Sequence, residues 1–276
     1  MLNIENTFIK IPGVKREYHF LQIADVHIAY AKEDESEEDK AVAQKETKAW
    51  SSEGVTPLET WKLMEDYVQE EEKNIDALLI AGDCLDYFSV SNFELLKEKI
   101  EALPTEVLYT PGNHELAVFT GNQPRIGQVY HEYYDVVMSG DADFWVRDYG
   151  DFLMIGINNA DKNITRDQLD QFKEQIARKI PIVLLIHIPI QTEAVLDAIE
   201  QTWGFRNMYF IFEANDEASE ASKEFSRIVR SAESNVAAIL AGHIHAAHEG
   251  EFAPGRMQYT AAPLHYKYVR KIIIAP

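Results

Sequence analysis

The chain has 276 residues, 46% hydrophobic and 26% charged, a composition typical of a compact globular protein rather than a disordered one. Its formal net charge of -20, from 46 Asp and Glu against 26 Lys and Arg, disfavours binding to a nucleic-acid polymer or an anionic membrane. The length suits one layered domain with a large core, so we expect a single domain over residues 1–276.

The N-terminus and the cysteine content both favour a cytoplasmic protein. The stretch MLNIENTFIKIPG has no basic region followed by an apolar run, and no segment reaches the length of a membrane span. The single cysteine, Cys84, excludes an internal disulfide and fits a reducing compartment. We interpret Cys84 as a small buried thiol rather than a nucleophile.

Strand and helix patterns alternate in the first third of the chain. The predicted strands are HFLQIAD (19–25), DALLIAGD (76–83) and EVLYTPGN (106–113). Between them, capping boxes that begin at Thr56 and at Ser91 predict helices that extend to about residues 72 and 101. This βαβαβ order predicts a parallel sheet with polar sites at the carboxyl ends of its strands.

The remainder of the chain predicts a second, partly antiparallel sheet. A hairpin is expected over 144–158, a capping box at Thr165 opens a helix, and the apolar run 180–187 ends in His187. Further helices are expected at 191–203 and about 216–232, and further strands at 236–242 and near 248–253, 257–262 and 268–274.

Two segments are candidate walls of a binding site. The polar, acidic insertion at about 28–56 is either a solvated loop with some helix or a lid whose Trp50 closes over a substrate. The aromatic side chains of GFRNMYFIF (204–212) could stack on a base or belong to the core. Arg125 and Arg206 could contact a phosphate, although no motif places them there.

Five predicted strand ends carry side chains that bind divalent cations. They are Asp25-Val26-His27, Gly82-Asp83-Cys84-Leu85-Asp86, Gly112-Asn113-His114-Glu115, His187 and Gly242-His243-Ile244-His245. Carboxylate, imidazole and amide groups suit hard or borderline cations, and two aspartates, one asparagine and four histidines suffice for two ions that share a carboxylate. We therefore predict a dinuclear metal site.

The order of these motifs resembles that of the calcineurin-like metallophosphoesterases: D-x-H, G-D-x-x-D, G-N-H-[DE], a separate H, and G-H-x-H. All of them occur in this order between Asp25 and His245, which covers nearly the whole chain. The resemblance implies an α/β (α+β) fold, a four-layer αββα sandwich of two mixed β-sheets flanked by helices.

The resemblance also implies a role for each motif residue. One metal ion would be bound by Asp25, His27 and His245, the other by Asn113, His187 and His243, and Asp83 would bridge them. His114 would contact the phosphate and protonate the leaving oxygen. Either Asp86 or Glu115 would orient its ring, although Asp86 could equally be a turn residue and Glu115 the start of a helix.

The implied chemistry is metal-dependent phosphoester hydrolysis. Two divalent ions (Mn, Fe or Zn) against two ligand carboxylates leave a local charge of about +2, which attracts a phosphate dianion. Such a pair of ions lowers the pKa of a bridging water, and the resulting hydroxide attacks in line. The expected substrate is a small phosphodiester, such as a cyclic nucleotide, or a small phosphomonoester.

Comparison with the motifs of related proteins weighs against three alternatives. Protein serine/threonine phosphatases carry Arg-Gly after G-D-x-x-D, where this chain has Tyr87-Phe88. Repair nucleases usually add a DNA-contacting region after the last histidine motif, yet only 31 residues follow His245. A catalytically silent scaffold tends to lose ligands, whereas this chain keeps the full set.

The other histidines are interpreted as structural or surface groups: His19, His131, His248 and His265. The sequence leaves the oligomeric state open.

Overall fold

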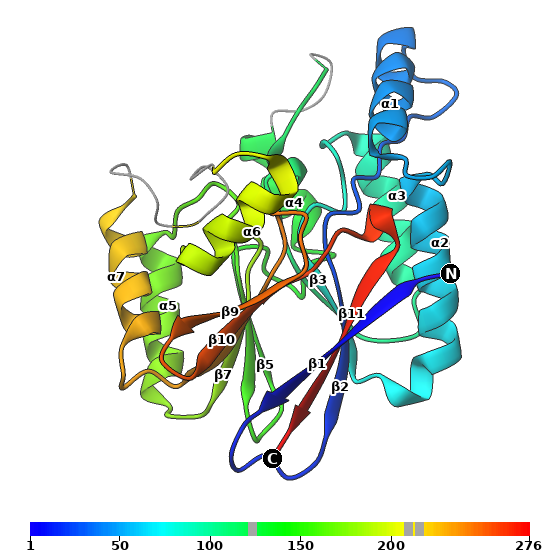
Figure 1. Cartoon of the computed structure of the whole chain (residues 1–276). Helices are drawn as coiled ribbons and strands as arrows, with labels where there is room; N and C mark the ends of the chain where they lie inside the picture. The colour runs from blue at the N-terminus through cyan, green and yellow to red at the C-terminus, as the bar shows by residue number, and fades with distance from the viewer. Residues whose placement is uncertain (121–125, 207–211, 213–217) are drawn as a thin grey trace.

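The computed structural model describes residues 1–120, 126–206, 212 and 218–276. Two β-sheets pack face to face, and helices cover the outer face of each sheet (Figure 1). The predicted αββα sandwich of two mixed sheets is therefore confirmed.

The first sheet joins the N-terminal third of the chain to its last strand. In spatial order its strands are β1 (Asn3–Lys10), β11 (Tyr268–Ala275), β2 (Tyr18–Ile23), β3 (Ala77–Ala81) and β4 (Val107–Thr110). β11 runs antiparallel to β2, whereas the other neighbouring strands are parallel. The predicted parallel arrangement of the first third is confirmed.

Two helices cover the outer face of this sheet, α2 (Pro57–Glu71) and α3 (Val90–Glu101). The capping box at Thr56 is present as predicted. The predicted cap at Ser91 is wrong, because Ser89 caps α3 and its side chain accepts a hydrogen bond from the backbone N–H of Asn92. Ser89 has the extended backbone that a cap requires, while Ser91 already lies in the first turn.

The second sheet contains the middle of the chain. In spatial order its strands are β5 (Phe144–Asp148), β6 (Leu153–Ile157), β7 (Ile182–Leu185), β8 (Val236–Ala241), β10 (Arg256–Thr260) and β9 (His248–Ala253). Only its two outer pairs, β5 with β6 and β10 with β9, are antiparallel in the described residues.

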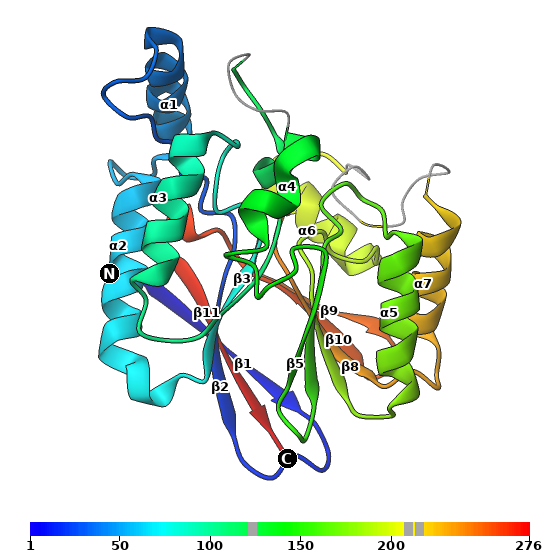
Figure 2. The same cartoon turned by 180° about the vertical axis from the view of Figure 1, so that it is seen from behind.

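The helices of the second half lie on the other side of the molecule. α5 (Arg166–Ala177) and α7 (Glu220–Arg230) pack on the outer face of the second sheet, and α6 (Glu193–Trp203) lies beside β9 (Figure 2). The capping box of α5 at Thr165 is present as predicted. α4 (Ile126–Tyr134), which the sequence did not predict, packs Tyr130 and Tyr134 into the cluster under α2 and α3.

The core between the sheets fixes the strand ends in space. Phe20 and Leu79 of the first sheet pack against Met154, Val183 and Leu240 of the second. Central strands such as β3 and β7 are buried along their whole length, which explains their continuous apolar sequences. The loops at the carboxyl ends of both sheets are consequently held side by side.

The sequence does not predict β1, and it predicts the helix in the insertion at 28–56 only in outline. β1 is an edge strand with several polar residues, and its Phe8 is 71% exposed, so no clear alternation marks it. The insertion at 28–56 contains the helix α1 (Glu37–Trp50), capped by Ser36, which stands above α2 and α3 (Figure 1). In the described residues no helix is long and apolar enough to cross a membrane.

Candidate metal centre

The predicted ligand residues meet at the carboxyl ends of β2, β3, β4, β7 and β8, between the two sheets. Five of them have left-handed backbone conformations: Asp25, His27, Asp83, His243 and His245 have φ values of 54°, 56°, 54°, 69° and 55°. This conformation costs a non-glycine residue about 1–2 kcal/mol, and such residues collect at functional sites. The strained turns bring the side chains inward as soon as each strand ends.

Two glycines let these loops approach one another. A Cβ atom on Gly112 would lie 2.1 Å from Oδ1 of Asp83, and one on Gly82 would lie 2.4 Å from Nδ1 of His187. Gly82 also has a φ of +83°, which favours glycine. The glycines of the G-D and G-N motifs are therefore required by space as well as by conformation.

One set of side chains, called the Asp25 group, consists of Asp25, His27 and His245. Nε2 of His27 lies 3.2 Å from Nε2 of His245, and the latter atom lies 3.5 Å from Oδ1 of Asp25. All three side chains are at most 8% exposed. Their ligand atoms converge on one point.

The other set, called the Asp83 group, consists of Asp83, Asn113, His187 and His243. Nε2 of His187 lies 3.2 Å from Oδ2 of Asp83, 3.1 Å from Oδ1 of Asn113 and 3.1 Å from Nδ1 of His243. Nδ1 of His187 faces the carbonyl oxygen of Ala81 at 2.7 Å and therefore carries a proton. In a neutral ring the lone pair of Nε2 then faces two oxygen acceptors, an arrangement that only a positive charge stabilises.

These distances fit metal coordination. Nitrogen and oxygen ligands bound at about 2.0–2.2 Å to one ion lie about 3.0–3.5 Å from one another. The surroundings of His187 also favour a positive charge. Burial lowers the pKa of His187, but the charge of Asp83 outweighs burial and raises this pKa to about 9. The residues present therefore fit two cations, and all seven predicted ligands are brought together.

Asp86 joins this centre to His114. Its Oδ1 lies 3.2 Å from Nδ1 of His27 and 3.0 Å from Nδ1 of His114, and it accepts a hydrogen bond of 2.7 Å from Nε1 of Trp50. A carboxylate on the far nitrogen of a ligand imidazole fixes the tautomer and leaves the other nitrogen free to bind metal. The predicted orientation of His114 by Asp86 is consistent with this geometry.

His114 is more accessible than the side chains of the Asp25 group. Its side chain is 25% exposed, and its backbone N–H donates to Oδ1 of Asp83 at 2.9 Å. Burial lowers the pKa of His114, but Asp83 and Asp86 outweigh it and raise the pKa to about 10. Two bound cations would oppose that shift. One potential ligand atom of His114 also lies within 4.8 Å of those of His27 and Asp83.

Comparison with known proteins agrees with this geometry. The profile of the family described as calcineurin-like phosphoesterase matches residues 18–247. The chain belongs to the calcineurin-like phosphoesterase family. This membership supports metal-dependent hydrolysis of a phosphoester and the presence of divalent metal ions. No curated protein matches the chain closely enough to serve as a relative.

Two solved structures are similar to this chain, and the first of them shares its fold. A dimetal phosphatase from Danio rerio superposes with a TM-score of 0.55 at 12% identity, over 90% of this chain and 88% of that chain. A phosphopantetheinyl hydrolase from Mycobacterium tuberculosis gives a TM-score of 0.46 at 14% identity, over 90% of each chain.

Glu115 contacts different groups from those predicted for it. It is fully buried, and its carboxylate accepts hydrogen bonds from the backbone N–H groups of Asp83, Leu85 and Gly112 and from the hydroxyl of Tyr109. These donors occupy both oxygens, so Glu115 holds the loops of the calcineurin-like motifs together. The prediction that it orients the His114 ring finds no support in these contacts.

Two residues outside the family motifs complete the surroundings of the Asp25 group. The ring of Trp50 stacks on His27 with centroids 3.9 Å apart and an angle of 10°. His265, interpreted from the sequence as a structural histidine, lies 5.2 Å from His245 between ring centroids and is 1% exposed. The isolated histidine in APLHY gave no motif, so only its place in the fold reveals it.

The structure describes only some of the remaining candidates. Arg206 pairs with Glu193 and Asp197 on α6, while Arg125 and most of 204–212 lie outside the described residues. Cys84 is buried, and burial raises the pKa of its thiol, as expected of an inert cysteine. His131 lies at the surface beside Asp135.

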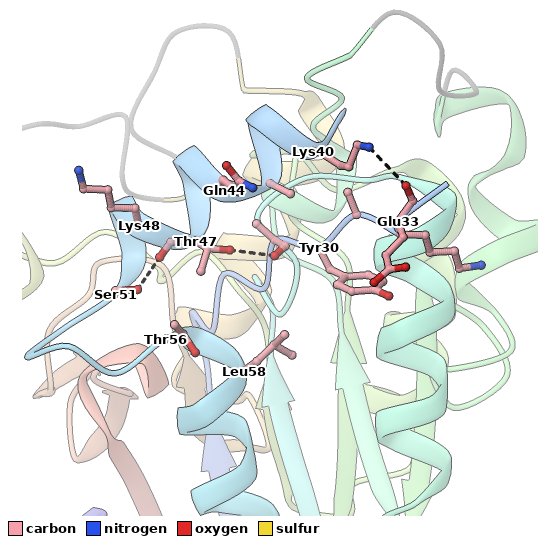
Figure 3. Close-up of a pocket in the computed structure, with 13 residues that line it drawn as sticks. Tyr30, Glu33, Lys40, Gln44, Thr47, Lys48, Ser51, Thr56 and Leu58 are labelled. Carbon is pink, nitrogen blue, oxygen red and sulfur yellow. Dashed lines mark hydrogen bonds between the residues drawn. The ribbon is translucent and has the colours of Figure 1, made fainter. Parts of the chain in front are cut away.

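A cavity of about 570 Å³ lies between α1, the loop after His27 and the start of α2 (Figure 3). Figure 3 shows Thr47 and Ser51 on the helix side, where Thr47 donates to the carbonyl oxygen of Ala29 at 2.9 Å. The lining residues include no predicted ligand. The cavity is therefore separate from the metal centre, although the helix that lines it also carries Trp50.

Proposed function

We propose that this chain hydrolyses a small phosphomonoester or phosphodiester at a centre of two divalent cations. The Asp25 group would hold one ion and the rest of the Asp83 group the other, with Asp83 between them. The convergence of seven predicted ligand side chains beside the partly exposed His114 carries the proposal.

The cations, when bound, supply an activated water and polarise the phosphoryl oxygens. The chain itself positions the substrate beside a proton donor. Nδ1 of His114 faces the backbone carbonyl oxygen of Asp86 at 2.7 Å, which leaves Nε2 for a substrate. Asp83 and Asp86 raise the pKa of His114 against the effect of burial. The protonated ring would therefore donate the proton on Nε2 to the leaving oxygen of the substrate.

Buried carboxylates and backbone groups preorganise the site before a substrate arrives. Asp86 fixes His27 and His114 together, so the distance between the metal ligands and the proton donor is set by one side chain. Glu115 fixes the backbone of Asp83 and Gly112. Such preorganisation lets electrostatic groups act without reorganising during the reaction.

The substrate class is narrowed by charge. The net charge of -20 opposes a polyanionic polymer, whereas a single phosphoester meets only the local positive charge of the centre. We therefore propose a small substrate and no nucleic-acid partner.

Hydrolysis of p-nitrophenyl phosphate and bis-p-nitrophenyl phosphate, measured side by side, tests the proposal. Protein reconstituted with Mn²⁺ should turn over at least one of them, and a chelator should abolish the activity. Preference for the diester would assign a phosphodiesterase, and preference for the monoester a phosphatase. Two bound metal ions without turnover of either compound would contradict the enzyme and favour a scaffold.

A further inference from the structure

His265 lies in a short 3₁₀ helix (Leu264–Tyr266) between β10 and β11. Its Nδ1 lies 2.9 Å from the backbone carbonyl oxygen of Asp25, a residue 240 positions away in the chain. A carbonyl oxygen only accepts hydrogen bonds, so Nδ1 carries the proton and Nε2 presents a lone pair. The contact thus fixes both the tautomer and the direction of the ring.

Nε2 of His265 has no hydrogen-bond partner among the described residues, although the side chain is 1% exposed. Leaving a buried polar atom without a partner costs free energy, so such an atom in a native protein needs an explanation. Potential ligand atoms of His27, His245 and His265 lie within 4.8 Å of one another. Because Nδ1 donates to Asp25, Nε2 is the ring nitrogen of His265 that remains to act as a ligand beside the Asp25 group.

We propose that His265 is an additional ligand of the cation held by the Asp25 group. The residue lies outside the five motifs that define the metal-binding residues of the chain. Its coordination would satisfy the lone pair, and the hydrogen bond to Asp25 would act as the outer contact that ligand imidazoles commonly make. The inference rests on the dinuclear centre of the proposed function.

This assignment makes the two ion sites chemically unequal. The Asp25 group with His265 offers three imidazoles and Asp25, besides the shared Asp83. The Asp83 group offers two imidazoles and the amide oxygen of Asn113, besides that carboxylate. Imidazole-rich sites suit Zn²⁺ and Fe²⁺, while oxygen ligands suit Mn²⁺. The Asp25 group should therefore bind Zn²⁺ more tightly than the Asp83 group does.

The substitution His265→Asn separates a ligand from a purely structural residue. The amide nitrogen of asparagine takes nearly the place of Nδ1 and can still donate to the carbonyl oxygen of Asp25. Nothing in asparagine replaces Nε2. His19→Ala is the matched control, because His19 lies at the opposite, amino-terminal end of β2.

Metal binding, not turnover, is the readout. Full-length wild type, His265→Asn and His19→Ala are titrated with Zn²⁺ against a chromophoric chelator, and their Co²⁺ forms are compared by visible absorption. Wild type and His19→Ala should bind two ions. In His265→Asn one of the two sites should weaken at least tenfold and the Co²⁺ spectrum should change, while urea unfolding in chelator stays as in wild type.

Other results overturn the inference. Two-site titrations and Co²⁺ spectra identical to wild type would show that His265 only supports the carbonyl oxygen of Asp25. Loss of stability in chelator with unchanged Zn²⁺ affinity would show the same. Failure of wild type to bind two ions would remove the dinuclear centre itself, a result that does not depend on His265 and contradicts the proposed function directly.

Discussion

The Asp25 group and the Asp83 group are supported by different parts of the chain. Around the Asp83 group, the backbone carbonyl oxygen of Ala81 accepts a hydrogen bond from Nδ1 of His187, and Glu115 fixes the motif loops. Around the Asp25 group, aromatic rings from outside the motifs pack on the ligands: Trp50 on His27, and His265 beside His245.

The difference shows that the motifs supply the ligands, whereas the groups that hold the ligands in place come partly from other segments of the chain. In the Asp83 group, the contacts of Glu115 join residues of the motifs themselves, and Asn159 accepts a hydrogen bond from the backbone N–H of His187. The Asp25 group is held by Asp86 and also by the insertion that forms α1 and the loop before β11, which lie outside the motifs. Substitutions in the two sets of supports should consequently affect different ions.

Asp83→Asn removes the side chain that we propose bridges the two ions, and it should have the largest effect. Loss of the bridging charge should reduce metal content and lower turnover by about 1,000-fold or more, since metal-ion catalysis supplies several kcal/mol. Metal analysis and phosphoester hydrolysis measure both quantities, with the exposed Asp170→Asn as control. Retention of two ions at wild-type affinity would show that Asp83 does not bridge the groups.

His114→Ala tests whether the proton donor is separate from both groups. Both ions should remain bound, and turnover should fall by about 100- to 10,000-fold on a poor leaving group, with a smaller loss on p-nitrophenolate. His131→Ala, at the surface, is the control. Loss of an ion would instead make His114 a ligand, as its distance from His27 and Asp83 allows.

Glu115→Gln should weaken the Asp83 group through its loops. The new amide nitrogen would face backbone N–H groups or the Tyr109 hydroxyl, which should lower the free energy of unfolding by about 2–3 kcal/mol. Urea unfolding in chelator measures this, with the exposed Glu174→Gln as control. Unchanged stability together with an altered pH profile of turnover would restore the prediction that Glu115 acts on His114.

Trp50→Leu should have the smallest effect, and only on the Asp25 group. Loss of the stacked ring and of its hydrogen bond to Asp86 should weaken one ion by about threefold to tenfold, as aromatic pairs contribute about 0.5–1.5 kcal/mol. A Zn²⁺ titration measures it, and the exposed Phe8→Leu is the control. Equal weakening of both sites would contradict separate supports.

The sequence by itself determined where the strands lie in the chain, apart from β1, and which motif residues converge, but it did not place β11 in the first sheet or His265 at the site. These features depend on local patterns: apolar runs make buried strands, and each motif spans a few residues at a strand end. Because the carboxyl ends of parallel strands meet at one edge of a sheet, the sequence predicts that Asp25, Asp83 and Asn113 are neighbours.

Only the tertiary structure decided how these residues are supported. His265 reaches Asp25 across 240 residues because β11 returns to pair with β2, and no local spacing encodes that pairing. Glu115 follows His114 in the sequence, which suggests that it orients the His114 ring. In the folded chain, however, its buried carboxylate accepts hydrogen bonds from backbone N–H groups. Contacts of this kind arise from the packing of distant segments, so they become visible only in the folded chain.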